Sequence, residues 1–213
     1  MSSYYSDDEQ VEKLKLWWQN YGPAVIVGVV LGLALLGGNK YWHHYKKTQA
    51  DAASVIYEKT LDQLKRKDWQ AGKQTAQQLL DAYAATPYAE LAALNLAGIH
   101  YRAGEKDMAK ERLEWAIKNA RSEASQQTAR LRLSRILFDD GELEPALDKL
   151  GDKPAVGFES EYYELKADLL LGKGQIDEAR DLYRNALQNV DGGSAYTEIL
   201  QMKLDNLGAG KDK

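Results

Sequence analysis

The sequence predicts an all-α protein in which an N-terminal transmembrane helix is followed by an α-solenoid of stacked helical hairpins. Residues 16–39 contain no Asp, Glu, Lys, Arg or His, and no other stretch of the chain is apolar for so long. From residue 43 onward, alanine, leucine, glutamate, lysine and glutamine dominate without a run of alternating β-branched residues, which favours helices over strands. Three glycines in this second part recur at a nearly constant spacing, which indicates a repeated helical unit.

The apolar stretch has the length and the ends of a membrane-spanning helix. At about 1.5 Å per residue, residues 16–39 make a helix of roughly 36 Å, enough to cross a hydrocarbon core of about 30 Å. Aromatic side chains of the kind that settle at headgroup depth flank the stretch on both sides. These predicted interfacial anchors are Trp17, Trp18, Tyr21, Tyr41 and Trp42. A core helix would not need such a belt, so we expect residues 16–42 to span the membrane and contact lipid.

A short acidic leader, residues 1–15, precedes the span. Val11, Leu14 and Trp18 recur at helical spacing, so we expect an amphipathic helix on the membrane surface that turns into the span near Pro23. A cleavable signal peptide is the alternative, but it should begin with a basic region and end in a small-residue cleavage site. Neither is present here, so we interpret the stretch as an uncleaved anchor.

One face of the predicted span is built from small residues. Ala24, Gly28 and Gly32 repeat every fourth residue, a pattern that lets the backbone of another membrane helix approach closely. Glycine is also common in membrane helices that make no such contact. Both interpretations of this face stay open.

The lysines beside the span do not fix its orientation. Two of them, at positions 13 and 15, precede it, and three, at positions 40, 46 and 47, follow it. This count weakly favours a cytoplasmic C-terminal domain. Large domains, however, are exported largely regardless of such charges, so the count does not decide the topology.

The repeated unit is predicted to be a helical hairpin with a tight turn. Its three glycines lie 37 and 33 residues apart, close to the period of about 34 residues in tetratricopeptide (TPR) repeats. A small residue stands seven positions before each glycine and another five positions after it, which lets the two helices of a hairpin touch. One hairpin cannot bury its apolar face alone, so neighbours must stack. The predicted packing residues are Ala97, Gly104, Ala109, Ser134, Gly141, Ala146, Ala167, Gly174 and Ala179.

The TPR-like repeat domain is predicted to span residues 68–208. A long linking helix, residues 43–67, joins it to the membrane span, and residues 76–83 belong to a degenerate first unit. A capping helix ends the stack, and the tail, residues 209–213, is predicted to be disordered. The face that the capping helix turns to the stack is predicted to contain Tyr196, Ile199, Leu200, the aliphatic stem of Lys203, Leu204 and Leu207.

The first helix of each hairpin is predicted to line a concave face that binds a protein segment. The positions −3, +1, +4 and +5 from the central packing residue lie on one side of a helix. Their side chains combine aromatic, apolar and charged groups, although each of them singly also fits a solvated helix face. The candidate groove residues are Tyr101, Arg102, Arg135, Phe138, Asp139, Glu164, Asp168 and Leu171.

The sequence offers no constellation for catalysis or metal binding. The chain has no cysteine, and the adjacent His43 and His44 point about 100° apart on a helix, unlike the i, i+4 pair of a zinc helix. Asp139 and Asp140 lack the spacing of a calcium loop. A net charge of −4 argues against a nucleic-acid partner. We therefore expect no enzyme, no cofactor and no metal.

Taken together, these features resemble the bacterial YfgM family of single-span inner-membrane proteins with a TPR-like periplasmic domain. The resemblance implies a cytoplasmic N-terminus, a periplasmic C-terminal domain and an ancillary role at the Sec translocon beside a PpiD-like membrane-anchored chaperone. We expect the tethered domain to bind that chaperone, unfolded secretory polypeptides, or both. The resemblance is carried by residues 9–12 (EQVE), Lys15, Trp17, Trp18, Asn20, Gly22, Gly28, Gly32, Tyr41, Trp42, the three hairpin glycines, Met202, Lys203, Asn206 and Leu207.

Two other functions stay open from the sequence. The chain fits a regulator that binds a soluble partner through its cytoplasmic leader, residues 1–15. It also fits an envelope or cell-wall biogenesis factor that uses the repeat domain only as a support.

Overall fold

The computed structural model describes residues 7–190 and 195–208, and over these residues the chain forms nine helices and no strand. The predicted all-α fold class is therefore confirmed. The tail predicted to be disordered lies outside the described residues. The helices are α1 (Asp7–Lys65), α2 (Trp69–Ala82), α3 (Pro87–Arg102), α4 (Lys106–Asn119), α5 (Glu123–Asp139), α6 (Leu143–Leu150), α7 (Glu159–Gly172), α8 (Ile176–Gln188) and α9 (Ala195–Gly208).

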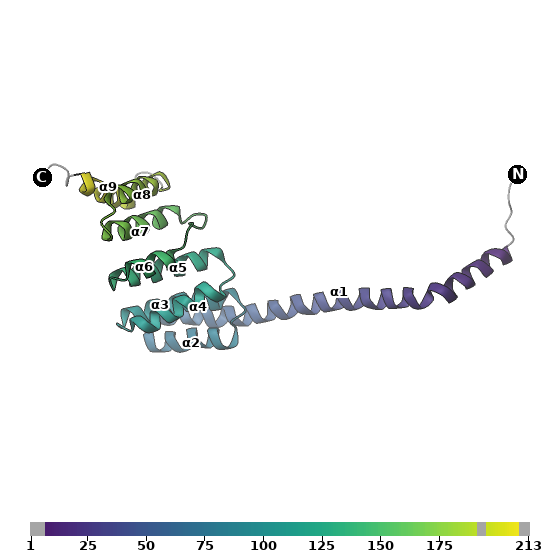
Figure 1. Cartoon of the computed structure of the whole chain (residues 1–213). Coiled ribbons are helices and arrows are strands. Elements are labelled where there is room, and N and C mark those ends of the chain that lie inside the picture. Colours follow the sequence, from purple (N-terminus) through teal and green to yellow (C-terminus); the bar gives the residue numbers. More distant parts are fainter. Residues whose placement is uncertain (1–6, 191–194, 209–213) are drawn as a thin grey trace. The chain divides into compact units, whose positions relative to one another are not determined.

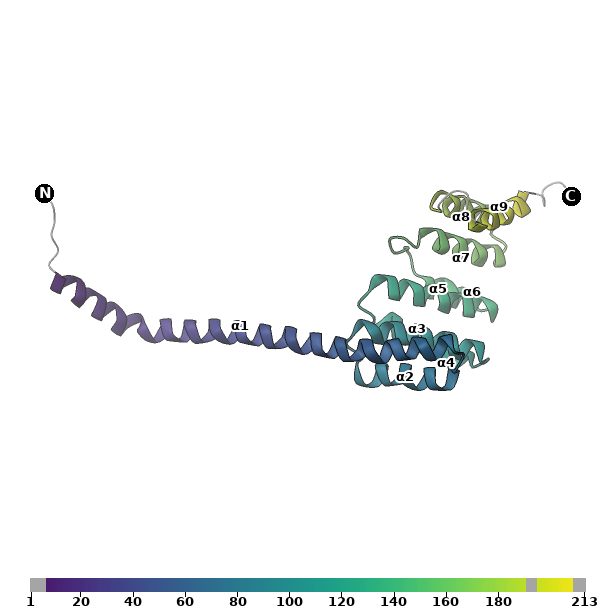
Figure 2. The ribbon, with the colours of Figure 1, turned by 180° about the vertical axis from the view of Figure 1, so that it is seen from behind.

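Helix α1 is uninterrupted from the predicted leader to the predicted linking helix. It continues through Pro23 without a break between the predicted leader helix and the predicted span. Proline removes only one backbone hydrogen bond, and the remaining bonds keep the ladder intact on both sides. The N-terminal part of α1 bends instead, as Figure 2 shows, and proline inside a helix causes such a bend by crowding the carbonyl four residues earlier.

The first compact unit of the chain, Met1–Gln49, contains one candidate membrane span. Helix α1 is long and apolar enough to cross a membrane, with a mean hydropathy of 2.0 in its most apolar window. Only 6% of that window is buried. A helix that is apolar on all sides is typical of a membrane span or of a protein core, and this one has the exposure of a span.

The residues predicted to anchor and pack the span lie on its surface. The rings of Trp17 and Tyr21 are 5.9 Å apart between centroids, and Lys46 Nζ lies 5.1 Å from the Trp42 ring centroid. Nothing lies within 4 Å of a Cβ added at Gly28 or Gly32, so the small-residue face is open to contact. The anchors have exposed fractions between 46% and 73%, and they are Trp17, Trp18, Tyr21, Tyr41 and Trp42; Ala24 is exposed as well.

The second compact unit begins at Ala50 and is a stack of four helical hairpins followed by α9. The hairpins pair α3 with α4, α5 with α6 and α7 with α8, and the first helices of successive hairpins touch, α3 with α5 and α5 with α7. Figure 1 shows α2 to α9 stacked in sequence order. The C-terminal end of α1 completes the first hairpin, because Thr60 Oγ1 donates to Thr75 Oγ1 of α2 at 2.9 Å. The second compact unit thus includes the C-terminal part of the predicted linking helix.

The turns between paired helices follow one pattern. Gly104, Gly141 and Gly174 have φ angles of 78°, 81° and 78°, in the left-handed region that only glycine enters without strain. In each turn the backbone N–H of the residue after the glycine donates to the carbonyl five residues earlier, as Glu105 does to His100. This hydrogen bond caps the C-terminal end of the helix.

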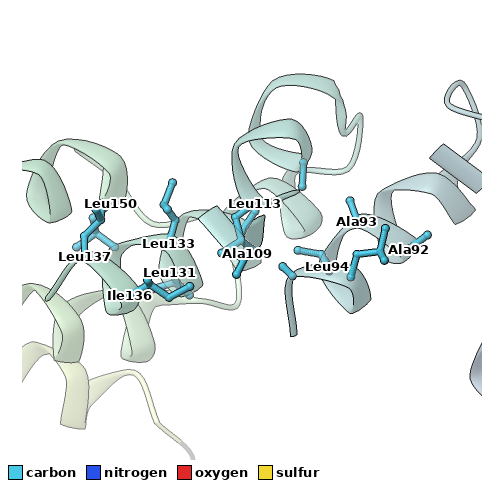
Figure 3. Close-up of a cluster of buried hydrophobic side chains, with 14 of the residues drawn as sticks. Ala92, Ala93, Leu94, Ala109, Leu113, Leu131, Leu133, Ile136, Leu137 and Leu150 are labelled. Atoms are coloured by element: carbon cyan, nitrogen blue, oxygen red, sulfur yellow. The ribbon is translucent and has the colours of Figure 1, made fainter. Parts of the chain in front are cut away.

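Small and aliphatic side chains fill the space between the helices. Figure 3 shows alanines and leucines of successive helices gathered in one buried cluster. Ser134 also packs between two paired helices, and its Oγ donates to the Ala146 carbonyl of the second helix at 2.8 Å. The side chains assigned to helix contact are 0–3% exposed, and they are Ala97, Ala109, Ser134, Ala146, Ala167 and Ala179.

Candidate functional site

Four of the eight predicted groove residues line one cavity of about 470 Å³. Tyr101 and Arg102 come from the end of α3, and Arg135 and Asp139 come from the end of α5. Because α3 and α5 are the first helices of successive hairpins, equivalent positions one repeat apart face the same space. We call this cavity the α3–α5 groove. Its lining residues are Leu64, Trp69, Leu94, Asn95, Ala97, Gly98, Ile99, Tyr101, Arg102, Leu113, Arg132, Arg135, Ile136 and Asp139.

Two contacts position the polar side chains of the groove. The Tyr101 hydroxyl donates to Asp139 Oδ2 at 3.1 Å, across one repeat of the sequence. The guanidinium carbon of Arg102 lies 5.4 Å from the Trp69 ring centroid, within the range of a cation–π interaction. The groove therefore presents two aromatic rings and a guanidinium group that are already oriented before any partner binds.

Sequence reasoning missed three polar or aromatic residues of the groove, Trp69, Asn95 and Arg132. Asn95 and Arg132 both stand two positions before the central packing residue of their helix. A residue at −2 shares a helix face with those at +1 and +5, so extending the predicted stripe by one turn finds both. Trp69 begins α2 and carries no repeat signal, so only the folded chain places it here.

The α3–α5 groove is cationic. Arg132 Nη1 donates one hydrogen bond, to the Leu94 carbonyl at 3.2 Å. Burial lowers the pKa of Arg132, and the neighbouring charge of Arg135 lowers it further. Arg135 makes no hydrogen bond or ion pair with any residue that the structure describes. Asp139, the only carboxylate in the lining, already accepts a hydrogen bond.

The predicted groove does not continue onto α7, because side chains of α9 bind the α7 carboxylates that were predicted to line it. Lys203 Nζ of α9 lies 2.7 Å from Glu164 Oε1 and 2.8 Å from Asp168 Oδ2. The Tyr196 hydroxyl donates to Glu164 Oε2 at 2.8 Å, and the Tyr183 hydroxyl donates to Asp168. Glu164 and Asp168 thus fasten the last helix of the stack and do not form an open surface.

The donors in this α7–α9 network stay protonated at neutral pH. Burial and the Asp168 carboxylate raise the pKa of Tyr183 above its ordinary value, and burial and Glu164 do the same for Tyr196. Burial lowers the pKa of Lys203, but its hydrogen bonds to the two carboxylates outweigh this effect and leave the pKa raised.

The two remaining groove candidates lie elsewhere. Phe138 is half-buried and packs against the core cluster, beside Gly172 at the end of α7. Leu171 is 36% exposed near the turn between α7 and α8. Ile199, expected on the inner face of the capping helix, is 46% exposed, whereas Leu200 is fully buried.

Charged side chains at the hairpin turns join one hairpin to the next. Hydrogen bonds from Lys73 and from the buried His100 lower the pKa of Glu105. Hydrogen bonds from Lys106 and Lys110, both on α4, lower the pKa of Asp140. These contacts tie α2 to the α3–α4 turn and α4 to the α5–α6 turn. Among residues 10–190 and 195–208, no three His, Asp or Glu side chains are grouped to hold a metal ion.

Comparison with known proteins gives one family match. A family model described as "Tetratricopeptide repeat-like domain" matches residues 15–209, which include both the candidate span and the hairpin stack.

Curated relatives match the chain from end to end. A protein of Haemophilus influenzae is 28% identical over 207 residues, which make up 97% of this chain and 100% of that protein. A protein of Escherichia coli is 28% identical over 210 residues, 97% of this chain and 99% of its own length. A protein of Neisseria gonorrhoeae is 26% identical over 211 residues, with 97% and 100% covered. Each is named "Ancillary SecYEG translocon subunit".

Proposed function

The chain belongs to the family of tetratricopeptide repeat-like domain proteins, and from this premise we propose that it is a membrane-tethered scaffold ancillary to a Sec translocon. Proteins with TPR-like stacks act through their surfaces, because the solenoid presents an extended concave face. In this chain the α3–α5 groove is that face, and α1 is the tether.

One observation carries the translocon association: the named relatives match this chain over its apolar helix and its repeats alike. Each alignment covers 97% of the chain. Repeat domains by themselves occur in proteins of many functions. The combination of an apolar helix with this particular stack fits fewer functions than the repeats alone. The predicted resemblance to the YfgM family is confirmed by these relatives, whose names describe translocon subunits and no enzymatic activity.

The finer parts of the proposal concern topology and partners. We place the protein in the bacterial inner membrane as a single-pass protein, with its N-terminus in the cytoplasm and its repeat domain in the periplasm. There the repeat domain binds a PpiD-like membrane-anchored chaperone, emerging secretory polypeptides, or both. Tethering raises the effective concentration of the groove near the translocon, so weak contacts suffice for this role.

Co-purification tests the association. The full-length protein is extracted from membranes with a mild detergent and isolated through an affinity tag. We expect translocon membrane subunits and a PpiD-like chaperone to be recovered with it. A tagged single-span protein with an unrelated span is the control. Recovery of neither partner above this control would contradict the proposal.

A reporter fused after residue 213 tests the topology. An enzyme that is active only in the periplasm should give full activity at this position, and one that is active only in the cytoplasm should give none. The opposite result would place the repeat domain in the cytoplasm and overturn the proposed location.

A further inference from the structure

We propose that the α3–α5 groove binds an extended polypeptide segment in which a carboxylate side chain stands next to an aromatic or aliphatic one. This inference rests on the proposed scaffold function and adds the chemistry of the ligand. It is drawn from the lining of the groove, in which apolar residues lie beside three guanidinium groups and a single carboxylate.

The charge of the groove selects an anionic partner. Three guanidinium groups, those of Arg102, Arg132 and Arg135, line it together with one carboxylate. That carboxylate, on Asp139, already accepts from Tyr101 at 3.1 Å. The protein as a whole carries a net charge of −4, so this local positive charge is opposite in sign to the rest of the chain. A carboxylate that reaches the groove gains charge-assisted hydrogen bonds that this part of the chain leaves unmade.

The donors of the groove are available. Arg135 makes no hydrogen bond or ion pair with the described residues, and Arg102 interacts with the face of the Trp69 ring. Arg132 uses one of its N–H groups, on the Leu94 carbonyl at 3.2 Å, and the rest of its guanidinium is free to donate.

The apolar part of the groove favours a polypeptide over a free anion. Trp69 and Tyr101 are 40% and 41% exposed, so their rings are accessible to a partner. Leu94, Ile99 and Ile136 line the groove as well, although each of them is only 6–7% exposed. A small inorganic anion would leave this surface in water, whereas a side chain next to the bound carboxylate covers it. The cavity of about 470 Å³ has room for such side chains.

Peptide binding to the full-length protein in detergent tests the inference. The probe is a short fluorescein-labelled peptide in which Asp alternates with Phe and Leu, and its partner probe has Asn in place of every Asp. We expect the wild-type protein to bind the acidic peptide about ten-fold more tightly, the effect of one charge-assisted hydrogen bond. Equal affinity for the two peptides would overturn the inference.

Two matched variants locate the binding. Arg135→Gln removes a guanidinium that makes no hydrogen bond or ion pair with the described residues, so the fold should be unaffected, and we expect this variant to bind the acidic peptide about ten-fold less tightly. Arg184→Gln on α8 makes the same charge change at an exposed side chain paired only with Asp181. It should bind like the wild type, and equal losses in both variants would overturn the assignment to the groove.

Two further measurements complete the test. Unlabelled acidic peptide should displace the probe, whereas inorganic phosphate that supplies the same total concentration of negative charge should not. Equal displacement by the two competitors would show a general anion site and overturn the assignment to a polypeptide. Co-purification with translocon subunits should be the same for Arg184→Gln and the wild type. If translocon subunits co-purify but the protein shows no preference for the acidic peptide, only the inference about the groove is contradicted. If the protein prefers the acidic peptide but no translocon subunit co-purifies, only the proposed function is contradicted.

Discussion

Lys203 is the side chain that fastens the last helix to the stack. It reaches from α9 to two carboxylates of α7, Glu164 and Asp168, whose side chains are 12% and 22% exposed. Two carboxylates so close to each other repel unless a cation lies between them. Tyr183 and Tyr196 donate to the same pair and complete a network that ties α7, α8 and α9 together.

The change Lys203→Met should lower the free energy of unfolding by about 1–3 kcal/mol. Removing one partner of a largely buried pair leaves uncompensated charge, and the partial exposure of Lys203 reduces that cost. Urea unfolding followed by circular dichroism measures the difference, and hydrogen exchange should show the loss of protection first in α9.

Lys149→Met is the matched control for this change. It breaks an ion pair with Glu114 of similar length, 3.0 Å, whose side chains are 39% and 56% exposed. Such surface pairs contribute only about 0–1 kcal/mol. The pKa of Lys203 is raised, so its contribution is present below its ordinary pKa of 10.5 and is lost as the pH rises through its native value. Equal effects of the two changes at neutral pH would contradict the role assigned to Lys203.

At the scale of the element, the hairpin is set by its turn glycine. The glycines of three successive turns all have positive φ, and for each of them a Cβ added by substitution would meet nothing within 4 Å. The requirement is therefore one of backbone conformation and not of space.

The change Gly141→Ala should cost about 1 kcal/mol of unfolding free energy, because alanine disfavours the left-handed region by about 1–2 kcal/mol. Gly98→Ala is the matched control, since Gly98 lies inside α3 and its added Cβ also meets nothing within 4 Å. We expect that change to be neutral or to stabilise by up to about 1 kcal/mol, through helix propensity. Urea unfolding of both variants measures the two changes in unfolding free energy. A similar loss of stability in both variants would contradict the assignment of the cost to the backbone conformation of Gly141.

The groove shows how far repeat spacing predicts a site. Spacing correctly placed Tyr101, Arg102, Arg135 and Asp139 around one cavity, because positions one repeat apart in stacked hairpins face the same way. It failed on α7, where a helix from the end of the chain covers the equivalent positions. Which helix covers which face depends on packing between distant segments, and a periodic pattern within one helix does not contain that information.

At the scale of the whole molecule, the chain divides into two compact units, and the boundary falls inside α1. The second unit begins at Ala50, so the last turns of α1 belong to the hairpin stack. Thr75 accepts and donates across the first hairpin: it accepts from Thr60 at 2.9 Å, and its own hydroxyl donates to Gln63 Oε1 at 2.7 Å.

A fragment of residues 50–213 should therefore fold without the membrane helix and melt within a few degrees of the full-length protein. A fragment of residues 66–213 is the control. It lacks the end of α1, leaves the apolar face of α2 uncovered and should melt at a clearly lower temperature, because a terminal hairpin needs both of its helices. Thermal unfolding followed by circular dichroism measures both. Identical melting of the two fragments would show that α1 is only a tether.

The sequence by itself determined the apolar helix, the helical hairpins and their period, because these depend on interactions between residues close in the chain. Uninterrupted hydrophobicity specifies a span, and glycine specifies a turn. Only the tertiary structure decided that the end of α1 packs with the hairpin stack, that Trp69 joins the groove, and that Lys203 closes the end of the stack. These outcomes are contacts between segments far apart in sequence, where packing and charge pairing act only once the chain has folded.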